Sequence, residues 1–175
     1  MDYKEDDVEV SLEQVSAAFD RLHLDGLPGA FDLTRAQVEA LYAAGHQLLG
    51  KGDLERAKGV FNFLVLCEGQ DARCWTALAV TLHKQKKWSL ATDAYSMAAL
   101  LDATNVKLYF HAAECLMQNR EWARAKQTLE SFFEVADAVY GKDKSKIRQF
   151  VDKAQAWQRV IEVKVPAGEN TGATP

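Results

Sequence analysis

The sequence predicts an all-α protein built from three stacked pairs of helices. Small residues recur at a fixed interval of about 34 residues, in two registers: Gly45, Ala79 and Ala113, and then Ala57, Ala91 and Ala125. Bulky residues recur at the same interval, at Leu41, Trp75 and Tyr109. A period of this size is typical of repeat proteins, in which one supersecondary unit is copied along the chain.

The two kinds of register have different physical roles. Small residues stand where helix backbones approach closely, and bulky residues fill the space between neighbours, so each repeat buries its apolar face only against the next one. The pattern resembles the tetratricopeptide repeat, which has this period. One departure concerns the end of the second helix, where that family usually has Pro and this chain has Gly69, Ala103 and Asp137. Because Gly and Asp also end helices, we expect three tandem tetratricopeptide repeats, an α-solenoid, with an N-terminal helix and a C-terminal capping helix.

The first segment, residues 1–33, contains an acidic tail and one amphipathic helix. Ser11 and Gln14 form a capping box, and an apolar stripe follows at helical spacing. The stripe consists of Leu12, Val15, Phe19 and Leu22. It lies outside the repeats, so we expect it to pack either on the array or on a second molecule.

The three repeats are expected over residues 34–140. Thr34 and Gln37 form a second capping box at the first helix, and Asp53 caps the second helix, residues 54–68. Repeat two is expected to have helices at 72–85 and 89–101, and repeat three at 105–118 and 121–140, with Asn105 as a cap and Gly141 at the close.

A capping helix is expected within residues 141–165, from about Ser145 to Glu162. Its apolar stripe is Ile147, Phe150, Val151, Ala154, Trp157 and Ile161. A helix with one apolar and one charged face suits the open end of an array. Residues 166–175 have no periodicity and are predicted to be disordered.

Composition limits the classes of function. Apolar residues make up 48% and charged residues 26%, which excludes a wholly disordered chain. The net charge of −4 disfavours a nucleic-acid partner. No apolar run reaches the length of a membrane span and the acidic start is no signal peptide, so we predict a cytoplasmic protein. The three cysteines lack Cys-x-x-Cys spacing and are expected to be reduced structural thiols.

The first helix of each repeat lines the inner face of such an array. Removing the packing positions leaves nine groove-lining residues: Tyr42, His46, Leu49, Thr76, Val80, His83, Phe110, Glu114 and Met117. This set is mainly apolar and aromatic, which favours an extended peptide whose hydrophobic side chains enter successive pockets. The alternative is that some of these residues are half-buried filler.

Sites for other chemistry are not expected. His46 and His83 lie on different repeats with no companion ligand at metal spacing, so no metal is predicted. His111, Glu114 and Cys115 fall within one helical turn, but one helix face provides no opposed base and no oxyanion site, so we predict that the chain is not an enzyme. The stretch from Gly141 to Ser145 lacks the glycine-rich lead of a phosphate loop, and no cofactor is expected.

Repeat three contains the string FHAAECLMQ at residues 110–118. With three repeats and an amphipathic first helix, it resembles the class II chaperones of bacterial type III secretion over about residues 8–162. The resemblance implies binding of the N-terminal segment of a hydrophobic translocator, of the Pro-x-Leu-x-x-Pro kind, along the groove. The chaperone would keep this client soluble and apart from its partner translocator before secretion.

The resemblance also bears on particular residues. Tyr42 and Phe110 match aromatic groove positions of the family, whereas His46 and Leu49 stand where members often have aromatic residues. Members commonly form homodimers through the N-terminal helix, which would suit the stripe from Leu12 to Leu22. Some members are also transcriptional coregulators, and these residues do not decide that question.

A second function class stays open, a general tetratricopeptide adaptor that binds another peptide or protein. Capture of a C-terminal carboxylate would need cationic side chains in the groove, and only Arg73 and Lys107 lie near it in the predicted repeats.

Overall fold

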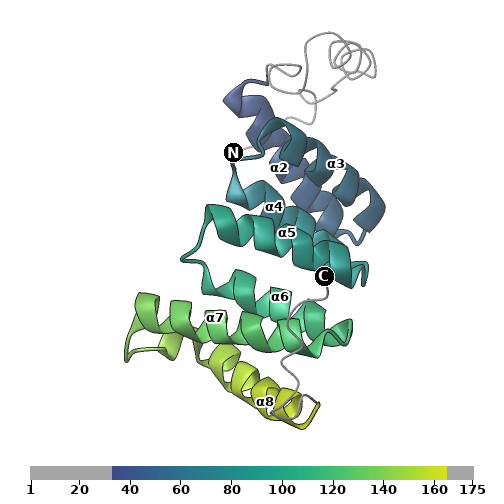
Figure 1. Cartoon of the computed structure of the whole chain (residues 1–175). Coiled ribbons are helices and arrows are strands. Elements are labelled where there is room, and N and C mark those ends of the chain that lie inside the picture. Colours follow the sequence, from purple (N-terminus) through teal and green to yellow (C-terminus); the bar gives the residue numbers. More distant parts are fainter. Residues whose placement is uncertain (1–32, 165–175) are drawn as a thin grey trace, which may run out of the picture. The chain divides into compact units, whose positions relative to one another are not determined.

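A computed structural model of the chain describes residues 33–164. Within that range the chain folds into helices α2 to α8 and one short 3-10 helix, without a strand (Figure 1). The prediction of an all-helical repeat fold is confirmed. The chain divides into two compact units, Met1–Gly69 and Gln70–Pro175.

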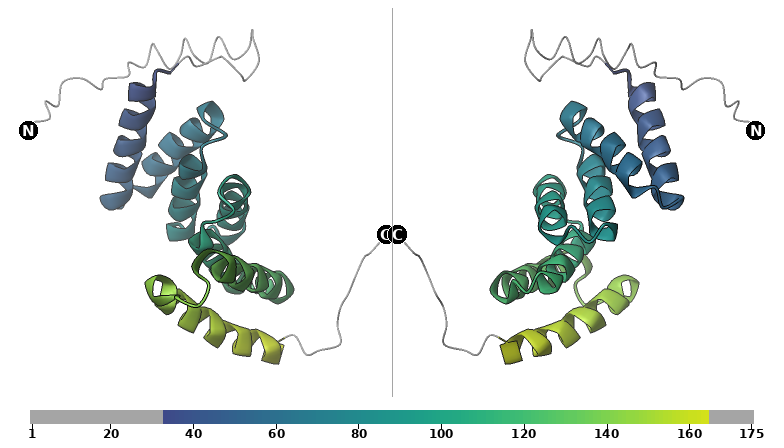
Figure 2. Two further views of the ribbon diagram at one scale, coloured as in Figure 1. Left: turned by 90° about the vertical axis from the view of Figure 1, so that its left-hand side faces the viewer. Right: turned by 90° about the vertical axis from the view of Figure 1, so that its right-hand side faces the viewer.

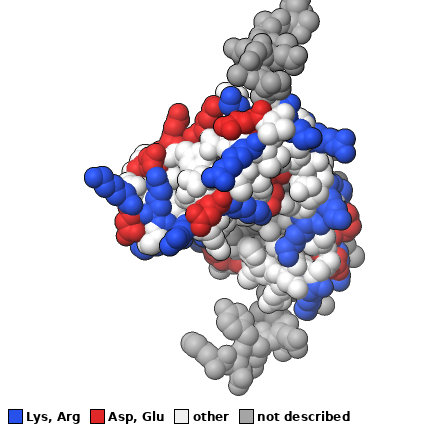
Figure 3. Space-filling view, turned by 90° about the horizontal axis from the view of Figure 1, so that it is seen from below, with Lys and Arg blue, Asp and Glu red and all other residues white. Residues whose placement is uncertain are grey.

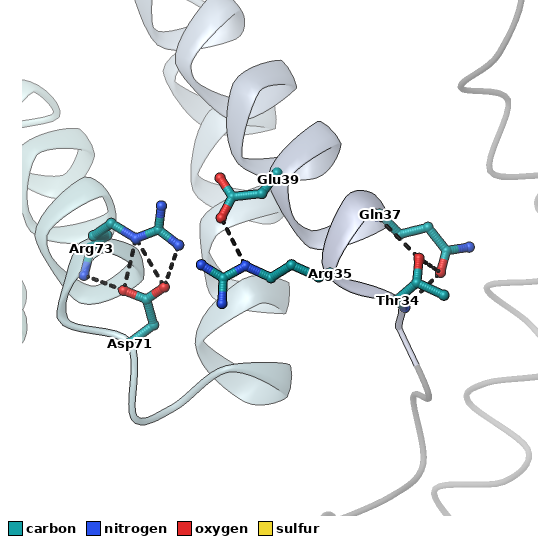
Figure 4. Close-up of polar contacts among 6 residues, drawn as sticks. All are labelled: Thr34, Arg35, Gln37, Glu39, Asp71 and Arg73. Carbon is teal, nitrogen blue, oxygen red and sulfur yellow. Dashed lines mark hydrogen bonds and ion pairs between the residues drawn. The ribbon is translucent and has the colours of Figure 1, made fainter.

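The described part of the first unit is a helix pair, α2 (Arg35–Gly50) and α3 (Leu54–Cys67). The predicted capping box opens α2: the Thr34 amide donates to Gln37 Oε1 at 2.8 Å, and the Gln37 amide donates to Thr34 Oγ1 at 3.3 Å (Figure 4). Asp53 caps α3 as predicted, since its side chain accepts a hydrogen bond from the Arg56 amide. Side-chain caps of this kind satisfy amides that the first turn leaves without a helical partner.

Close approach of the two helices explains the glycine at position 45. A Cβ atom built there would lie 2.7 Å from a ring carbon of Phe61, which is fully buried. The aligned alanines Ala57, Ala79, Ala91, Ala113 and Ala125 are also fully buried. The close approach predicted for the small residues is therefore seen at Gly45, and the aligned alanines lie in the core.

The second unit continues the pattern with five α-helices. They are α4 (Ala72–Lys84), α5 (Trp88–Leu101), α6 (Val106–Gln118), α7 (Trp122–Tyr140) and α8 (Arg148–Lys164), with the 3-10 helix η1 (Ser145–Ile147) before α8. Each helix packs on the next in the chain, and α8 packs on both α7 and α6 (Figure 2). At the start of α4, Asp71 accepts a hydrogen bond from the Arg73 amide and pairs with its guanidinium at 2.7 Å (Figure 4).

The turn inside each repeat has the same backbone form in all three repeats. Gly52, Lys86 and Arg120, which occupy the same position of successive repeats, have φ angles of 81°, 59° and 61°. In repeat two the Lys86 amide donates to His83 O and the Lys87 amide to Leu82 O, and the other two turns repeat this pair of bonds. This arrangement is the Schellman motif, which requires a left-handed residue just after the helix.

The second helix of repeat three ends where the sequence predicts. Helix α7 continues through Asp137 to Tyr140, and the Asp137 carboxylate pairs with the Lys144 ammonium. Gly141, with φ of 54°, follows α7 as predicted. Asn105 precedes α6 but makes no side-chain capping bond. The predicted first helix, with Leu12, Val15, Phe19 and Leu22, and the tail from residue 166 lie outside the described residues.

The core of the second unit's C-terminal half joins α6, α7 and α8. Ile147, Ala154 and Ile161 from the predicted apolar stripe are buried in it, and Phe150, Val151 and Trp157 pack against it. Charged side chains of both signs are interspersed on the face drawn in Figure 3. Over residues 33–164, no helix combines the length and the apolar character that a membrane span requires.

Candidate functional site

The nine groove-lining residues stand on the first helices of the three repeats. They occupy three equivalent positions, each recurring once per repeat: Tyr42, Thr76 and Phe110; His46, Val80 and Glu114; Leu49, His83 and Met117. The α2 residues belong to the first unit, and those of α4 and α6 to the second. Within each helix the spacing i, i+4, i+7 places the three residues on one face.

On α2, two of the three residues are accessible. Tyr42 is half-buried, and its ring meets the ring of the exposed His46 edge-on with centroids 4.5 Å apart. His46 also lies 5.3 Å from the Phe61 ring, and desolvation of the imidazole lowers its pKa. Leu49 is buried and belongs to the core. The surface available on α2 is therefore an aromatic pair, not three open positions.

On α4, the three residues are half-buried and have different surroundings. The Thr76 hydroxyl donates to the Ala72 carbonyl at 2.7 Å, so its hydrogen bond stays within the helix. Val80 presents an apolar side chain. The His83 ring lies edge-on to Trp88, and its Nδ1 atom is 3.4 Å from the Tyr95 hydroxyl.

On α6, Phe110 is not open to a ligand. It is only 2% exposed because α8 lies over it: its ring stacks on Trp157 at 4.7 Å and meets Phe150 edge-on at 4.9 Å. On the inner side it lies 5.9 Å from Phe132. Met117 is partly buried against the same core. The prediction that Phe110 lines an open surface is corrected: the α8 stripe, predicted as a cap, covers this position.

Glu114 is the centre of a charged cluster. Its Oε1 atom accepts a hydrogen bond from Lys153 Nζ at 2.9 Å, while Oε2 lies 3.3 Å from His111 Nδ1 and 3.8 Å from His83 Nε2. The His111 hydrogen bond, followed by the Lys153 ammonium, lowers the pKa of Glu114 to about 2. Burial lowers the pKa of His83. The carboxylate is therefore an anion at neutral pH.

This cluster corrects one expectation from the sequence. The spacing gives His83 no companion ligand, yet the fold brings its side chain close to those of His111 and Glu114. The i, i+3 spacing of His111 and Glu114 is visible in the sequence, but the approach of His83 and Lys153 depends on tertiary packing. Lys153 is a contact that the sequence pattern does not single out.

The third member of the suspected catalytic set is a poor nucleophile. Cys115 is fully buried, and burial, with the nearby Glu114 charge, raises the pKa of its thiol to about 12. A thiol in this environment stays protonated, whereas catalytic cysteines need the thiolate.

The chain is similar in sequence to a protein from Yersinia. The low calcium response locus protein H of Yersinia pestis is 31% identical over 98 residues, which is 56% of this chain and 58% of that protein. The chain thus matches little more than half the length of this curated relative. No protein-family model matches the chain.

Solved structures are similar over a larger part of the chain. The Yersinia enterocolitica chaperone SycD, in complex with a peptide of the translocator YopD, is similar with a TM-score of 0.68 and 25% identity over 77% of this chain and 98% of that chain. The same protein has also been solved in an alternative dimer. PcrH in complex with the chaperone binding region of PopD gives a TM-score of 0.67 and 25% identity, over 79% of this chain and 98% of that one. The expected resemblance is thereby confirmed in sequence and in fold.

Proposed function

We propose that this chain is a class II chaperone of type III secretion and that it binds an extended segment of a hydrophobic translocator in the bacterial cytoplasm. It keeps that client soluble and apart from its partner translocator before secretion. The observation that carries the proposal is the likeness to SycD, over 77% of this chain, in a structure that contains a translocator peptide. A binding role, not catalysis, agrees with the buried and protonated Cys115.

The aromatic pair Tyr42 and His46 is the proposed contact on the first repeat. Aromatic side chains bury a large apolar area and lose little conformational freedom on binding, so they suit the apolar side chains of an extended peptide. Val80 on α4 is proposed as a second apolar contact. Binding of the client lowers the population of free, aggregation-prone chain by mass action.

The first test is a titration of a labelled Pro-x-Leu-x-x-Pro peptide, taken from a translocator of the same genome, against the wild type and Tyr42→Glu. We expect saturable binding near micromolar, roughly −8 kcal/mol. We expect Tyr42→Glu to weaken it by at least ~10-fold, because a buried carboxylate without a partner is costly.

The matched control is Leu100→Glu, which places the same charge on the second helix of repeat two, where Leu100 is 77% exposed. It should leave both the affinity and the helical content unchanged. Equal affinity of the wild type and Tyr42→Glu would reject the proposed contact. Absence of peptide binding to every variant would favour the alternative, a general repeat adaptor with another partner.

The free chaperone is proposed to be a homodimer. SycD has been solved as a dimer, and the sequence predicts an apolar stripe suited to self-association, made of Leu12, Val15, Phe19 and Leu22. Light scattering of the wild type should give the mass of a dimer, and Phe19→Asp should shift it toward the monomer. A monomeric wild type at every concentration would exclude this assembly.

A further inference from the structure

His83, His111 and Glu114 bring three potential metal-ligand atoms together from two helices. We propose that these three side chains, the His-Glu cluster, bind a divalent transition-metal ion of the zinc class. The ligand atoms of the three residues all lie within 4.8 Å of one another. The proposal does not depend on translocator binding, because it rests on this geometry alone.

The distances within the cluster are close to those of a metal site. Glu114 Oε2 lies 3.3 Å from His111 Nδ1 and 3.8 Å from His83 Nε2. Imidazole nitrogen binds Zn²⁺ at about 2.0–2.1 Å, so ligand atoms around one tetrahedral ion lie roughly 3.3 Å apart. The two pairs that include Glu114 are near this separation, and rotation of the histidine side chains, whose ligand atoms lie within 4.8 Å of each other, would bring all three atoms to one ion. Imidazole and carboxylate ligands together favour Zn²⁺ over Mg²⁺ or Ca²⁺.

The outer contact of His83 fixes which nitrogen faces the cluster. Its Nδ1 atom lies 3.4 Å from the hydroxyl of Tyr95, which is 2% exposed. A ligating histidine usually donates its other ring N–H to a hydrogen-bond acceptor, and in the tautomer with the proton on Nδ1 the Tyr95 hydroxyl oxygen accepts this bond and orients the ring. With Nδ1 directed to Tyr95, Nε2 is the nitrogen presented to His111 and Glu114.

Lys153 is the internal competitor for the carboxylate. Its ammonium binds Glu114 Oε1, the oxygen that the two histidines do not approach, and leaves Oε2 toward them. The Lys153 side chain is 52% exposed, so it can turn toward solvent when an ion binds. Three protein ligands leave a fourth position of the ion for water or for a group from a bound partner.

The experiment is a calorimetric titration of ZnCl₂ into the full chain, with cobalt(II) absorption as a second measure of coordination geometry. We expect one ion per chain in the wild type. His83→Ala, His111→Ala and Glu114→Gln should each weaken binding by at least ~100-fold, because each removes a direct ligand. The matched control is His46→Ala, which removes an exposed histidine of the first unit and should leave the affinity unchanged.

Two further variants keep the test decisive if a ligand variant does not fold. Tyr95→Phe keeps the buried ring but removes the hydroxyl and should weaken binding by about 10-fold or more. Lys153→Ala should bind the ion more tightly than the wild type, because the competing ammonium is gone. No saturable binding, binding that survives in both His83→Ala and His111→Ala, or unchanged affinities in Tyr95→Phe and Lys153→Ala would overturn the proposal.

Discussion

Tyr42 on α2 and Phe110 on α6 are aromatic residues at the same position of their repeats, yet their surroundings differ. Tyr42 is half-buried and touches His46 and Phe61. Phe110 is buried under Trp157 and stacks on its indole. An aromatic residue at this position is thus available for binding only where no further helix covers it, and α8 covers repeat three.

The position four residues further along each helix also differs between the two repeats, here in its polar contacts. His46 on α2 is exposed and has aromatic neighbours, whereas Glu114 on α6 is held by His111 and by Lys153 of α8. The helix that closes repeat three therefore supplies both the ring that covers Phe110 and the cation that binds Glu114. A repeat position does not by itself determine whether a residue binds a ligand or stabilises the fold.

The largest effect is expected for Phe110→Ala, compared with Tyr42→Ala. Loss of the buried ring should lower the free energy of unfolding by about 3–5 kcal/mol, because a cavity remains among the surrounding rings. Tyr42→Ala should cost only about 1–2 kcal/mol, since part of its ring already faces water. Urea denaturation followed by circular dichroism measures both values.

The difference between the stability losses of Phe110→Ala and Tyr42→Ala distinguishes a core residue from a surface residue. Similar losses for both variants would mean that the two aromatic positions are equivalent after all. Lys126→Ala on α7, where the side chain is exposed, serves as the control and should change stability by less than about 0.5 kcal/mol.

A smaller effect is expected at the turns, where repeat one has Gly52 and repeat three has Arg120 in the same left-handed conformation. A side chain in this conformation costs roughly 1–2 kcal/mol, which glycine avoids. Arg120→Gly should therefore stabilise the protein by about 0.5–1 kcal/mol, and Gly52→Ala should destabilise it by about 1 kcal/mol. Urea denaturation measures both changes. A loss of stability in Arg120→Gly would show that contacts of the Arg120 side chain stabilise the fold by more than its left-handed backbone destabilises it.

Much of the fold was predictable from the sequence because the repeat pattern is strong. The registers of Gly45, Ala79 and Ala113 identified the close helix contacts, and Thr34 and Asp53 identified two helix starts. These features act locally or recur at a fixed interval, so a single sequence reveals them. The apolar stripe of α8 was equally clear as a helix that must pack on the repeats.

The candidate site was less predictable because it depends on which helices meet. The stripe of α8 indicated burial, but the position of Trp157 over Phe110 rather than elsewhere on the array is set by the turn at Gly141 and by η1. In the same way, His83 and Glu114 belong to different repeats with a whole helix, α5, between them in the chain, so their spacing in the sequence carries no sign of contact. Side-chain partners across a packed interface require the three-dimensional arrangement.

The close contact at Gly45 also determines how this chain tolerates change during evolution or in a mutant library. The ring that a new Cβ atom would meet belongs to Phe61, which is fully buried, so a side chain at position 45 requires this ring to move within a packed core. We expect a variant at position 45 to be tolerated better when position 61 carries a smaller residue. In a deep mutational scan of both positions, single variants at position 45 should be depleted. Double variants that also carry a smaller residue at position 61 should be retained.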